Sequence, residues 1–525
     1  MALVETFLGL IVVLGVVALL APRMRVPLSV ILVAAGVIIA LVPGLPTLEL
    51  DPGIVFFLFV PPIIYYAAFF SPWRDLRENV RPIALLASAL VLTTMVSVAV
   101  VAHRILPGFS WPLAFVLGAI VSPSDAVAVV DILKDLRLPR RLVSILKGES
   151  LLNDPVAIIS YRMSVAAVVA GTFSLWQAGV AFLFVAAGGI LVGLVLGWTA
   201  AWLRTHLNNP AIETTASILT PYAAFLVAEK LGVSGVLCVL IVGIYLGLQP
   251  RLASSVARLQ LTAAWGTLLF VMNGLVFLLM GMQIPPVVGR LAGHSFVNLA
   301  WAAVVICLTV IGVRFAWVFA NICYSCAMAR RRDFPWGEVV VTAWTGMRGL
   351  DSLITALALP LFVKSGAPFP ERDRILFITA CVILGTLLLQ GLTLPALVRR
   401  LGVSDVGQED REEAEARYLA AQAALKRIQE EMDHDPGLSA EGSVEQLRSR
   451  YEARLPRYAA KMRGGRDERS ETRVDAYHRL LNAAIDAERQ TILMLRDQGR
   501  ISNDVMHRIE RDLDLEEARH AEEKT

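Results

Sequence analysis

Long apolar stretches dominate the first four hundred residues of this chain and restrict the folds that it can adopt. A window of about 20 apolar residues is long enough to cross a bilayer as a helix. Of the 525 residues, 56% are hydrophobic and only 18% are charged, which is typical of a polytopic membrane protein and not of a soluble one. We expect thirteen spans, near residues 2–21, 26–43, 53–70, 82–102, 112–133, 142–169, 176–202, 210–229, 233–248, 262–284, 297–320, 335–361 and 375–398.

Basic residues in the connections between these windows predict the orientation. Lys and Arg concentrate in cytoplasmic loops. Every second connection is basic, as at Arg74 to Arg81 and at Lys134 to Arg141, whereas 43–52 and 171–177 carry few or no basic residues. Thirteen spans then place the N-terminus outside and the C-terminus in the cytoplasm. The first span has no basic leader and no convincing cleavage site, so we expect it to be retained as a helix.

The sequence changes character near residue 402. Residues 1–402 form the expected transmembrane domain, which is net basic, and residues 403–525 form an expected cytosolic helical tail, which is net acidic. Apolar residues recur in the tail at helical spacing, at Tyr418, Ala421, Leu425 and Ile428 and again at Tyr477, Leu481, Ile485 and Ile492. Breaks are expected at 435–437 and at Gly464-Gly465. A tail that packs on itself or on a partner protomer is favoured over a dedicated sensor.

Several kinds of function are disfavoured by what the sequence lacks. No GxxxxGK[ST] run is present, which argues against an ATP-driven pump, so concentrating work must come from an ion gradient. Cys323 and Cys326 have CxxC spacing, but no second ligand pair or nearby His accompanies them. We expect no cofactor, no enzymatic reaction and no nucleic-acid partner.

Ionisable residues inside the apolar windows point to ion transport. The run Gly148-Glu149-Ser150-Leu151-Leu152-Asn153-Asp154-Pro155 places two carboxylates, an amide and a hydroxyl in the sixth window. Such groups cost at least roughly 2.5 to 3.5 kcal/mol each at membrane depth, so they usually line an ion pathway or pair with one another. A buried structural ion pair is the competing interpretation. Pro155 is expected to bias Asp154 away from regular helix and to expose its carboxylate.

A second polar run, Ser122-Pro123-Ser124-Asp125, lies in the middle of the fifth window. Pro123 should kink or break the helix and free backbone carbonyls near the midplane. Such backbone is tolerated only where it is buried in protein or lines a cavity. Ser124 and Asp125 then supply oxygen ligands suited to a small alkali cation. A proline kink with Asp125 capping a half-helix is compatible with this interpretation.

A third irregularity, Gly346-Met347-Arg348-Gly349, lies in the twelfth window. If two inverted six-span repeats are joined by the seventh span, the fifth and twelfth spans are equivalent, and paired interrupted helices indicate a transporter binding site. The repeat is inferred from spacing, because we find no sequence identity between the halves. In crossed broken helices, Asp125 would neutralise the positive dipole ends and Arg348 the negative ends. Arg348 is therefore favoured as a structural residue over a direct ligand.

Three segments together resemble a known family. SPSDAVAVVDILK, LKGESLLNDPVAI and WTGMRGLDSLITALALP, at residues 122–134, 146–158 and 344–360, resemble the signature helices of the monovalent cation/proton antiporter-1 family, the sodium/proton exchangers, and the layout of the tail resembles its bacterial members. The resemblance implies an all-α polytopic fold with two inverted six-helix repeats and crossed broken helices. It also implies exchange of H⁺ for a monovalent cation across the plasma membrane for pH and salt homeostasis. Na⁺ is favoured over Li⁺ or K⁺, and a homodimer in contact with membrane lipid is expected.

The family's roles carry over to matching residues. Asp154 would be the carboxylate that binds either the cation or a proton, and Asn153 its partner in the Asn-Asp pair. Ser150 would lend a hydroxyl, and Ser124 with Asp125 would complete the site from the broken helix. The transported alkali cation would thus contact the oxygens of Asp154, Ser150 and Ser124.

The resemblance also implies a supporting shell around this site. Glu149 is expected to pair with a buried arginine, for which Arg314 is the matching candidate and Arg348 the alternative. Pro123 shapes the break in the fifth span. Asp351 stands where many relatives are apolar, so it either pairs with Arg348 or adds a titratable group to the pathway.

One departure concerns the third span. Some members carry a glutamate there after a Pro-Pro step, whereas the run Pro61-Pro62-Ile63-Ile64-Tyr65-Tyr66 offers tyrosine. The cation ligand or proton gate that this glutamate provides in those relatives is then missing here or is supplied by another residue.

The expected mechanism is competition at one carboxylate. Apolar surroundings disfavour the charged form of Asp154, while a bound cation stabilises it. Because Asn153 replaces a second aspartate, we expect electroneutral exchange. A passive cation channel, a non-transporting membrane sensor and a K⁺/H⁺ antiporter remain as alternatives.

Overall fold

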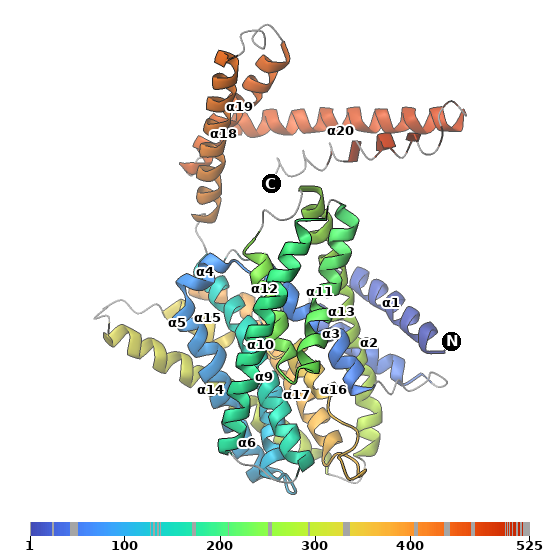
Figure 1. The fold of residues 1–525 in the computed structure, drawn as a ribbon, viewed down its shortest axis with the longest axis vertical. Helices are drawn as coiled ribbons and strands as arrows, with labels where there is room; N and C mark the ends of the chain where they lie inside the picture. Colours follow the sequence, from blue (N-terminus) through green and yellow to red (C-terminus); the bar gives the residue numbers. More distant parts are fainter. Residues whose placement is uncertain are drawn as a thin grey trace. The chain divides into compact units, whose positions relative to one another are not determined.

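The computed structural model describes residues 2–23, 26–42, 51–125, 138–170, 175–207, 209–249, 255–291, 295–328, 336–403, 408–434, 442–463 and 468–498, with isolated residues between 126 and 137 and after 498. The chain divides into two compact units, Met1–Ser404 and Asp405–Thr525. In these described ranges every regular element is a helix, apart from one isolated bridge between Phe362 and Pro368 (Figure 1).

Helices of the first unit coincide with the apolar windows. They are α1 (Ala2–Leu20), η1 (Ala21–Arg23), α2 (Leu28–Ala40), α3 (Pro52–Phe69), α4 (Trp73–Glu78), α5 (Val80–Ala84), the π-helical η2 (Leu85–Leu90), α6 (Val91–Ile105), α7 (Trp111–Val121), α9 (Arg140–Ala170), α10 (Leu175–Arg204), α11 (Pro210–Lys230), α12 (Gly235–Gly247), α13 (Ser255–Arg290), α14 (Phe296–Met328), α15 (Trp336–Trp344), α16 (Leu350–Leu357) and α17 (Arg372–Leu401). In the described part of the chain, 7 helices are long and apolar enough to cross a membrane. The predicted all-α membrane fold is confirmed, while the number of spans and the inverted repeat stay predictions.

Caps encoded in the sequence fix several helix ends. Asp51 precedes α3, and its carboxylate accepts from the backbone N–H of Gly53 at 2.7 Å, with Pro52 at the first helical position. Ser234 caps α12 in the same way. At the C-terminal end of α17, Gly402 adopts φ +63°, a left-handed conformation that glycine reaches without steric cost.

Two helices are interrupted where the sequence predicts breaks. Helix α7 ends at Val121 and residues 123–125 are not helical, while residues 345–349 separate α15 from α16. The two breaks meet, because the backbone N–H of Asp125 donates to the carbonyl of Met347 at 2.9 Å. Non-helical backbone from two distant parts of the chain is thus brought together inside the protein.

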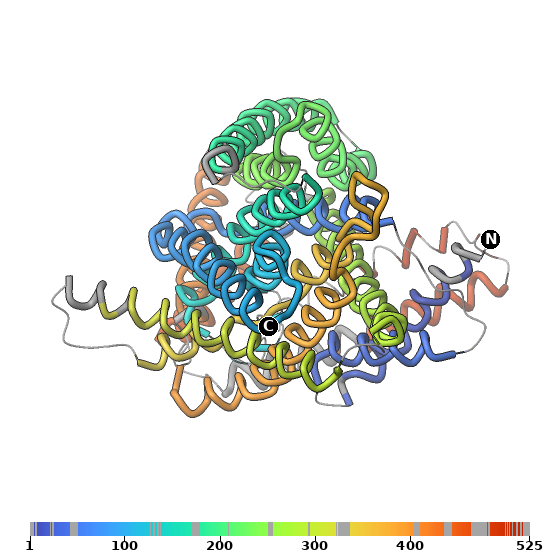
Figure 2. Tube along the Cα trace, turned by 90° about the horizontal axis from the view of Figure 1, so that it is seen from below, coloured from blue at the N-terminus to red at the C-terminus, as the bar shows by residue number. Residues whose placement is uncertain are grey.

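Helix α9 lies beside both breaks. It packs against α7 and also contacts α15 and α16, while α14 packs against α6, α15 and α17. Elsewhere in the unit α2 runs along α13, at the lower right of Figure 2. Helices α10 and α11 both pack on α12, at the top of the same view. The polar run of α9 therefore faces the interrupted helices from the middle of this unit.

The expectation for Pro155 was wrong. Helix α9 continues through it, and Asp154 is only 6% exposed. Proline removes one backbone donor from the helix, a loss that neighbouring helices compensate in membrane proteins. Burial of the residues on both sides of Pro155 holds the helix intact.

The second unit contains α18 (Gln408–His434), α19 (Gly442–Met462) and α20 (Glu468–Asp497). Helices α18 and α19 pack against each other. Ile485 and Ile492 on α20 form a small apolar cluster with Met506 and Leu513. The tail is thus helical and packs on itself. The breaks expected at 435–437 and Gly464-Gly465 lie outside the described residues.

Candidate functional site

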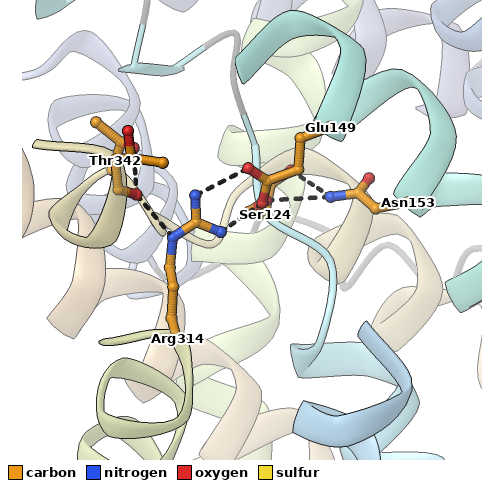
Figure 3. Close-up of polar contacts among 6 residues, drawn as sticks. Ser124, Glu149, Asn153, Arg314 and Thr342 are labelled. Atoms are coloured by element: carbon orange, nitrogen blue, oxygen red, sulfur yellow. Dashed lines mark hydrogen bonds and ion pairs between the residues drawn. The ribbon is translucent and has the colours of Figure 1, made fainter. Parts of the chain in front are cut away.

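A buried ion pair joins α9 to α14. The guanidinium of Arg314 donates from Nη2 to Glu149 Oε2 at 2.9 Å and also from Nη1 to Oε1 (Figure 3). Its Nε donates to the carbonyl oxygen of Thr342 at 3.2 Å. The two charged side chains are only 2% and 3% exposed. The planar guanidinium matches the carboxylate in two parallel bonds, so each charge is compensated where water is excluded.

Ser124 connects the first helix break to this pair. Its hydroxyl donates to Glu149 Oε1 at 2.6 Å. The Asn153 amide donates to the Ser124 carbonyl at 3.0 Å and to its Oγ at 3.1 Å. Pro123, which removes a helical donor beside Ser124, is buried in the same break. Backbone and side chain of the break are therefore held against α9.

Asp125 lies at the start of α16. Its Oδ2 accepts from the N–H of Leu350, the first residue of α16, at 3.2 Å, and its Oδ1 accepts from Ala128 N–H at 3.2 Å. A carboxylate is favourable at a helix N-terminus. A Cβ on Gly349 would collide with this carboxylate, and one on Gly346 would collide with the Arg314 side chain. Both glycines are required by the close approach.

Asp154 is buried beside this frame and has an unsatisfied oxygen. Among the described residues, neither Asp154 Oδ1 nor Asn153 Oδ1 has a hydrogen-bond partner. The Asp351 carboxyl group, in the first turn of α16, is within hydrogen-bonding reach of Asp154. Ser150, one turn before Asp154 on α9, is half-buried. The arrangement gathers oxygen atoms of acidic and amide side chains, and within the described residues no ion pair joins Asp154 to a basic side chain.

Arg348 does not pair with either carboxylate proposed for it. Its backbone N–H donates to Thr386 Oγ1 at 3.1 Å, and its side chain is 1% exposed. Over the described ranges its Nε and Nη1 have no hydrogen-bond partner, and no ion pair joins it to Glu149 or Asp351. Glu149 therefore pairs with Arg314, and Asp351 lies with Asp154.

This placement of Asp351 removes the reason for expecting electroneutral exchange. That expectation relied on Asn153 standing beside Asp154 in place of a second aspartate. Crossing of α16 and α9 supplies the second group from a residue distant in sequence.

Tyr65, in the run from Pro61 to Tyr66, has a partner on another helix. Its hydroxyl accepts from Arg204 Nη2 at 3.1 Å, and its ring packs on Trp265 with centroids 5.3 Å apart. It thereby joins α3 to α10 and α13. Thr342 binds Arg314 through its backbone carbonyl, a contact that no residue type signals in a sequence. Thr386 binds the Arg348 backbone N–H through its hydroxyl, and it was not predicted because threonine in an apolar span most often bonds its own helix.

A cavity of about 770 Å³ lies further along α9. It is bounded by α3, α9, α11 and the segment after α16, and it includes Tyr161, Arg162 and Glu229. Arg162 Nη1 and Glu229 Oε1 are 2.6 Å apart across it. Tyr161 lies two turns beyond Asp154 on α9, so the cavity lies toward one end of the helix that carries the site.

Comparisons with known proteins agree with this geometry. The family described as sodium/hydrogen exchanger, transmembrane, matches residues 9–400. An uncharacterized Na⁺/H⁺ exchanger of Mycobacterium tuberculosis H37Rv is 34% identical over 530 residues, covering 97% of this chain and 96% of the relative. A sodium, potassium, lithium and rubidium/H⁺ antiporter of Bacillus subtilis is 30% identical over 518 residues, covering 95% and 75%.

A solved structure supports the fold. The sodium proton antiporter MjNhaP1 of Methanocaldococcus jannaschii superposes with a TM-score of 0.60 at 19% identity, covering 76% of this chain and 99% of that one. The family match covers the segments that build the interrupted helices and the buried Asn-Asp pair. The chain therefore belongs to the sodium/hydrogen exchanger family of membrane transporters.

Proposed function

We propose that this protein is a secondary active antiporter that exchanges Na⁺ for H⁺ by alternating access. The observation that carries the proposal is the buried Asp154 carboxylate, which has an unsatisfied oxygen beside two interrupted helices. Names of the relatives support the class of transport: the M. tuberculosis and B. subtilis proteins are called a Na⁺/H⁺ exchanger and a Na⁺, K⁺, Li⁺ and Rb⁺/H⁺ antiporter.

Competition for Asp154 couples the two fluxes. A buried carboxylate without a partner is costly in its charged form, so it binds either a proton or a cation. The two states exclude each other because both use the same oxygens. Motion of one helix bundle against the other then carries the loaded site from one side of the membrane to the other.

The surrounding residues hold this site in place. Asn153, Ser124 and Asp125 fasten the first break to α9 and α16, and Ser150 with Ser124 offers hydroxyl oxygens to the cation. Glu149 with Arg314 anchors α14 to α9 through the buried ion pair. Arg348 acts as a structural cation near the breaks.

The same proposal includes the setting of the transporter. Residues 1–402 form the antiporter domain and 403–525 the cytosolic tail, with the N-terminus outside and the C-terminus in the cytoplasm. The protein would operate in the plasma membrane as a homodimer surrounded by lipid, without any enzymatic reaction, and serve pH and salt homeostasis. The alternating basic connections support the orientation.

Proton flux in proteoliposomes tests the proposal. Purified protein is reconstituted with a pH-sensitive dye inside, and Na⁺, Li⁺ or K⁺ is added outside after acid loading. We expect cation-evoked proton efflux from the wild type and none from Asp154→Asn. Asp373→Asn is a matched control, because Asp373 is a partly exposed aspartate bound to Arg290 on the surface.

Three outcomes would reject the proposal. Cation uptake without proton counter-flow identifies a channel. Absence of flux in the wild type under every gradient identifies a non-transporting protein. Full activity in Asp154→Asn removes that carboxylate from the mechanism.

A further inference from the structure

Asp351 brings a second carboxylate to Asp154 from a different helix. Asp154 belongs to the middle of α9, whereas Asp351 is in the first turn of α16, directly after the second break. Helix α16 contacts α9, and the two side chains lie within hydrogen-bonding reach of each other. Asp154 is 6% exposed and Asp351 is half-buried. Two acidic groups thus converge in a place where an uncompensated charge is expensive.

Neither of the two buried arginines near the site, Arg314 and Arg348, pairs with Asp154 or Asp351 in the described residues. Arg314 is engaged by both oxygens of Glu149. Arg348 forms no ion pair with Asp351 in the part of the chain that the structure describes. The structural alternative, in which Asp351 exists to neutralise Arg348, therefore has no contact to support it.

The third aspartate near the site has its own donors. Asp125 accepts from the backbone N–H groups of Leu350, at the start of α16, and of Ala128, so its charge is stabilised locally. Within the described residues, the Asp351 carboxylate has a hydrogen bond to its own backbone, and no backbone N–H of another residue donates to Asp154 or Asp351. The Thr355 hydroxyl donates to the backbone carbonyl of Asp351 at 2.7 Å and not to its carboxylate.

Unsatisfied oxygens lie next to the carboxylate pair. Asp154 Oδ1 and Asn153 Oδ1 are both buried, and neither has a hydrogen-bond partner among the described residues. Buried polar atoms are almost always partnered, so two such acceptors on adjacent residues require an explanation. Acceptors without donors, beside two carboxylates, form a set of hard oxygen ligands suited to a cation.

We propose that Asp351 is a ligand of the transported alkali cation, which is held between α9 and α16 by Asp154 and Asp351 together. This proposal rests on the proposed antiport function and names a specificity residue of the same site. A second carboxylate raises the electrostatic field strength of the site, and strong-field sites favour small cations. Asp351 should therefore favour Na⁺ and Li⁺ over K⁺.

Variants at Asp351 test this assignment. Asp351→Asn keeps the shape and one oxygen, Asp351→Val removes both oxygens, and Asp351→Glu keeps the charge. For each purified variant we would measure ²²Na⁺ binding at equilibrium, and in proteoliposomes the KM for Na⁺, Li⁺ and K⁺ with the maximal rate. Asp373→Asn again serves as the surface control. Size-exclusion chromatography checks that each variant is folded.

A ligand role predicts a selective loss of affinity. Removing one carboxylate at contact distance should raise the KM for Na⁺ and Li⁺ roughly tenfold or more, and that for K⁺ less, in both Asp351→Asn and Asp351→Val. Asp351→Glu should recover part of the Na⁺ affinity. A merely structural role would lower the maximal rate or the yield of folded protein while leaving the ratio of the Na⁺ and K⁺ KM values unchanged.

Two results separate the failure of this inference from failure of the antiport proposal. Unchanged ²²Na⁺ affinity and unchanged KM ratios in Asp351→Asn and Asp351→Val would overturn the ligand role while wild-type exchange persists. Absence of cation-evoked proton flux in the wild type would instead reject the antiport function, and ²²Na⁺ binding by the wild type and Asp351→Asn would still decide whether Asp351 is a ligand.

Discussion

Substituting Arg314 by methionine should destabilise the protein strongly, because it leaves Glu149 as an unpaired charge. The pair is 2% and 3% exposed and joins α14 to α9. Removing one partner of a buried ion pair costs about 3–5 kcal/mol. The hydrogen bond from Arg314 Nε to the Thr342 carbonyl is lost as well. A second substitution, Glu149→Gln in the same chain, removes the orphaned charge and should restore most of the stability.

An exposed pair provides the matched control. Arg290 also forms two bonds to an aspartate, Asp373, but its side chain is 50% exposed. Such a pair contributes about 0–1 kcal/mol. Arg290→Met should therefore shift the unfolding transition little, although the chemical change equals that at Arg314.

Unfolding of purified protein in detergent, followed by intrinsic fluorescence against temperature or denaturant, measures the comparison. We expect a large loss for Arg314→Met, a small one for Arg290→Met, and a favourable coupling energy in the cycle of Arg314→Met with Glu149→Gln. Equal losses for the two arginine variants, or strictly additive losses in the cycle, would refute the view that burial makes this pair indispensable.

Other substitutions test separate parts of the structure. Gly349→Ala places a methyl group against the Asp125 carboxylate and should abolish exchange, and the overpacking should cost about 1–3 kcal/mol. Gly312→Ala is the control and should remain active, because a Cβ there meets nothing within 4 Å. Equal exchange activities of the two variants would contradict the close approach at Gly349. Tyr65→Phe should lower thermal stability by leaving Arg204 without its acceptor, yet retain the wild-type KM for Na⁺; a raised KM would make Tyr65 part of the pathway. Deleting residues 405–525, a compact unit by contacts, should preserve cation-evoked proton flux, and a silent truncation would assign the tail a direct role.

Local chemistry in the sequence predicts the interrupted helices well. Pro123, Gly346 and Gly349 all lie in the two breaks, and each of these residue types disfavours regular helix through its own backbone. The same reasoning failed at Pro155, because burial of the residues around Pro155 in α9 outweighs the preference of a residue before proline for extended backbone.

Contacts between distant segments are less accessible to sequence reasoning. Arg314 and Arg348 were both candidates for Glu149, and only the packing of α14 on α9 decides between them. The position of Asp351 beside Asp154 depends likewise on where α16 crosses α9. The sequence shows that Asp351 is an acidic residue in an apolar span, but it does not show that Asp154 is its neighbour.

The most direct test of the account is whether cation binding displaces a proton from Asp154. Na⁺ is added to weakly buffered purified protein, and proton release is followed with a pH indicator while ²²Na⁺ binding is measured in parallel. The account predicts proton release that saturates together with Na⁺ binding in the wild type and the loss of both in Asp154→Asn. Na⁺ binding without proton release, or undiminished release in Asp154→Asn, would contradict it.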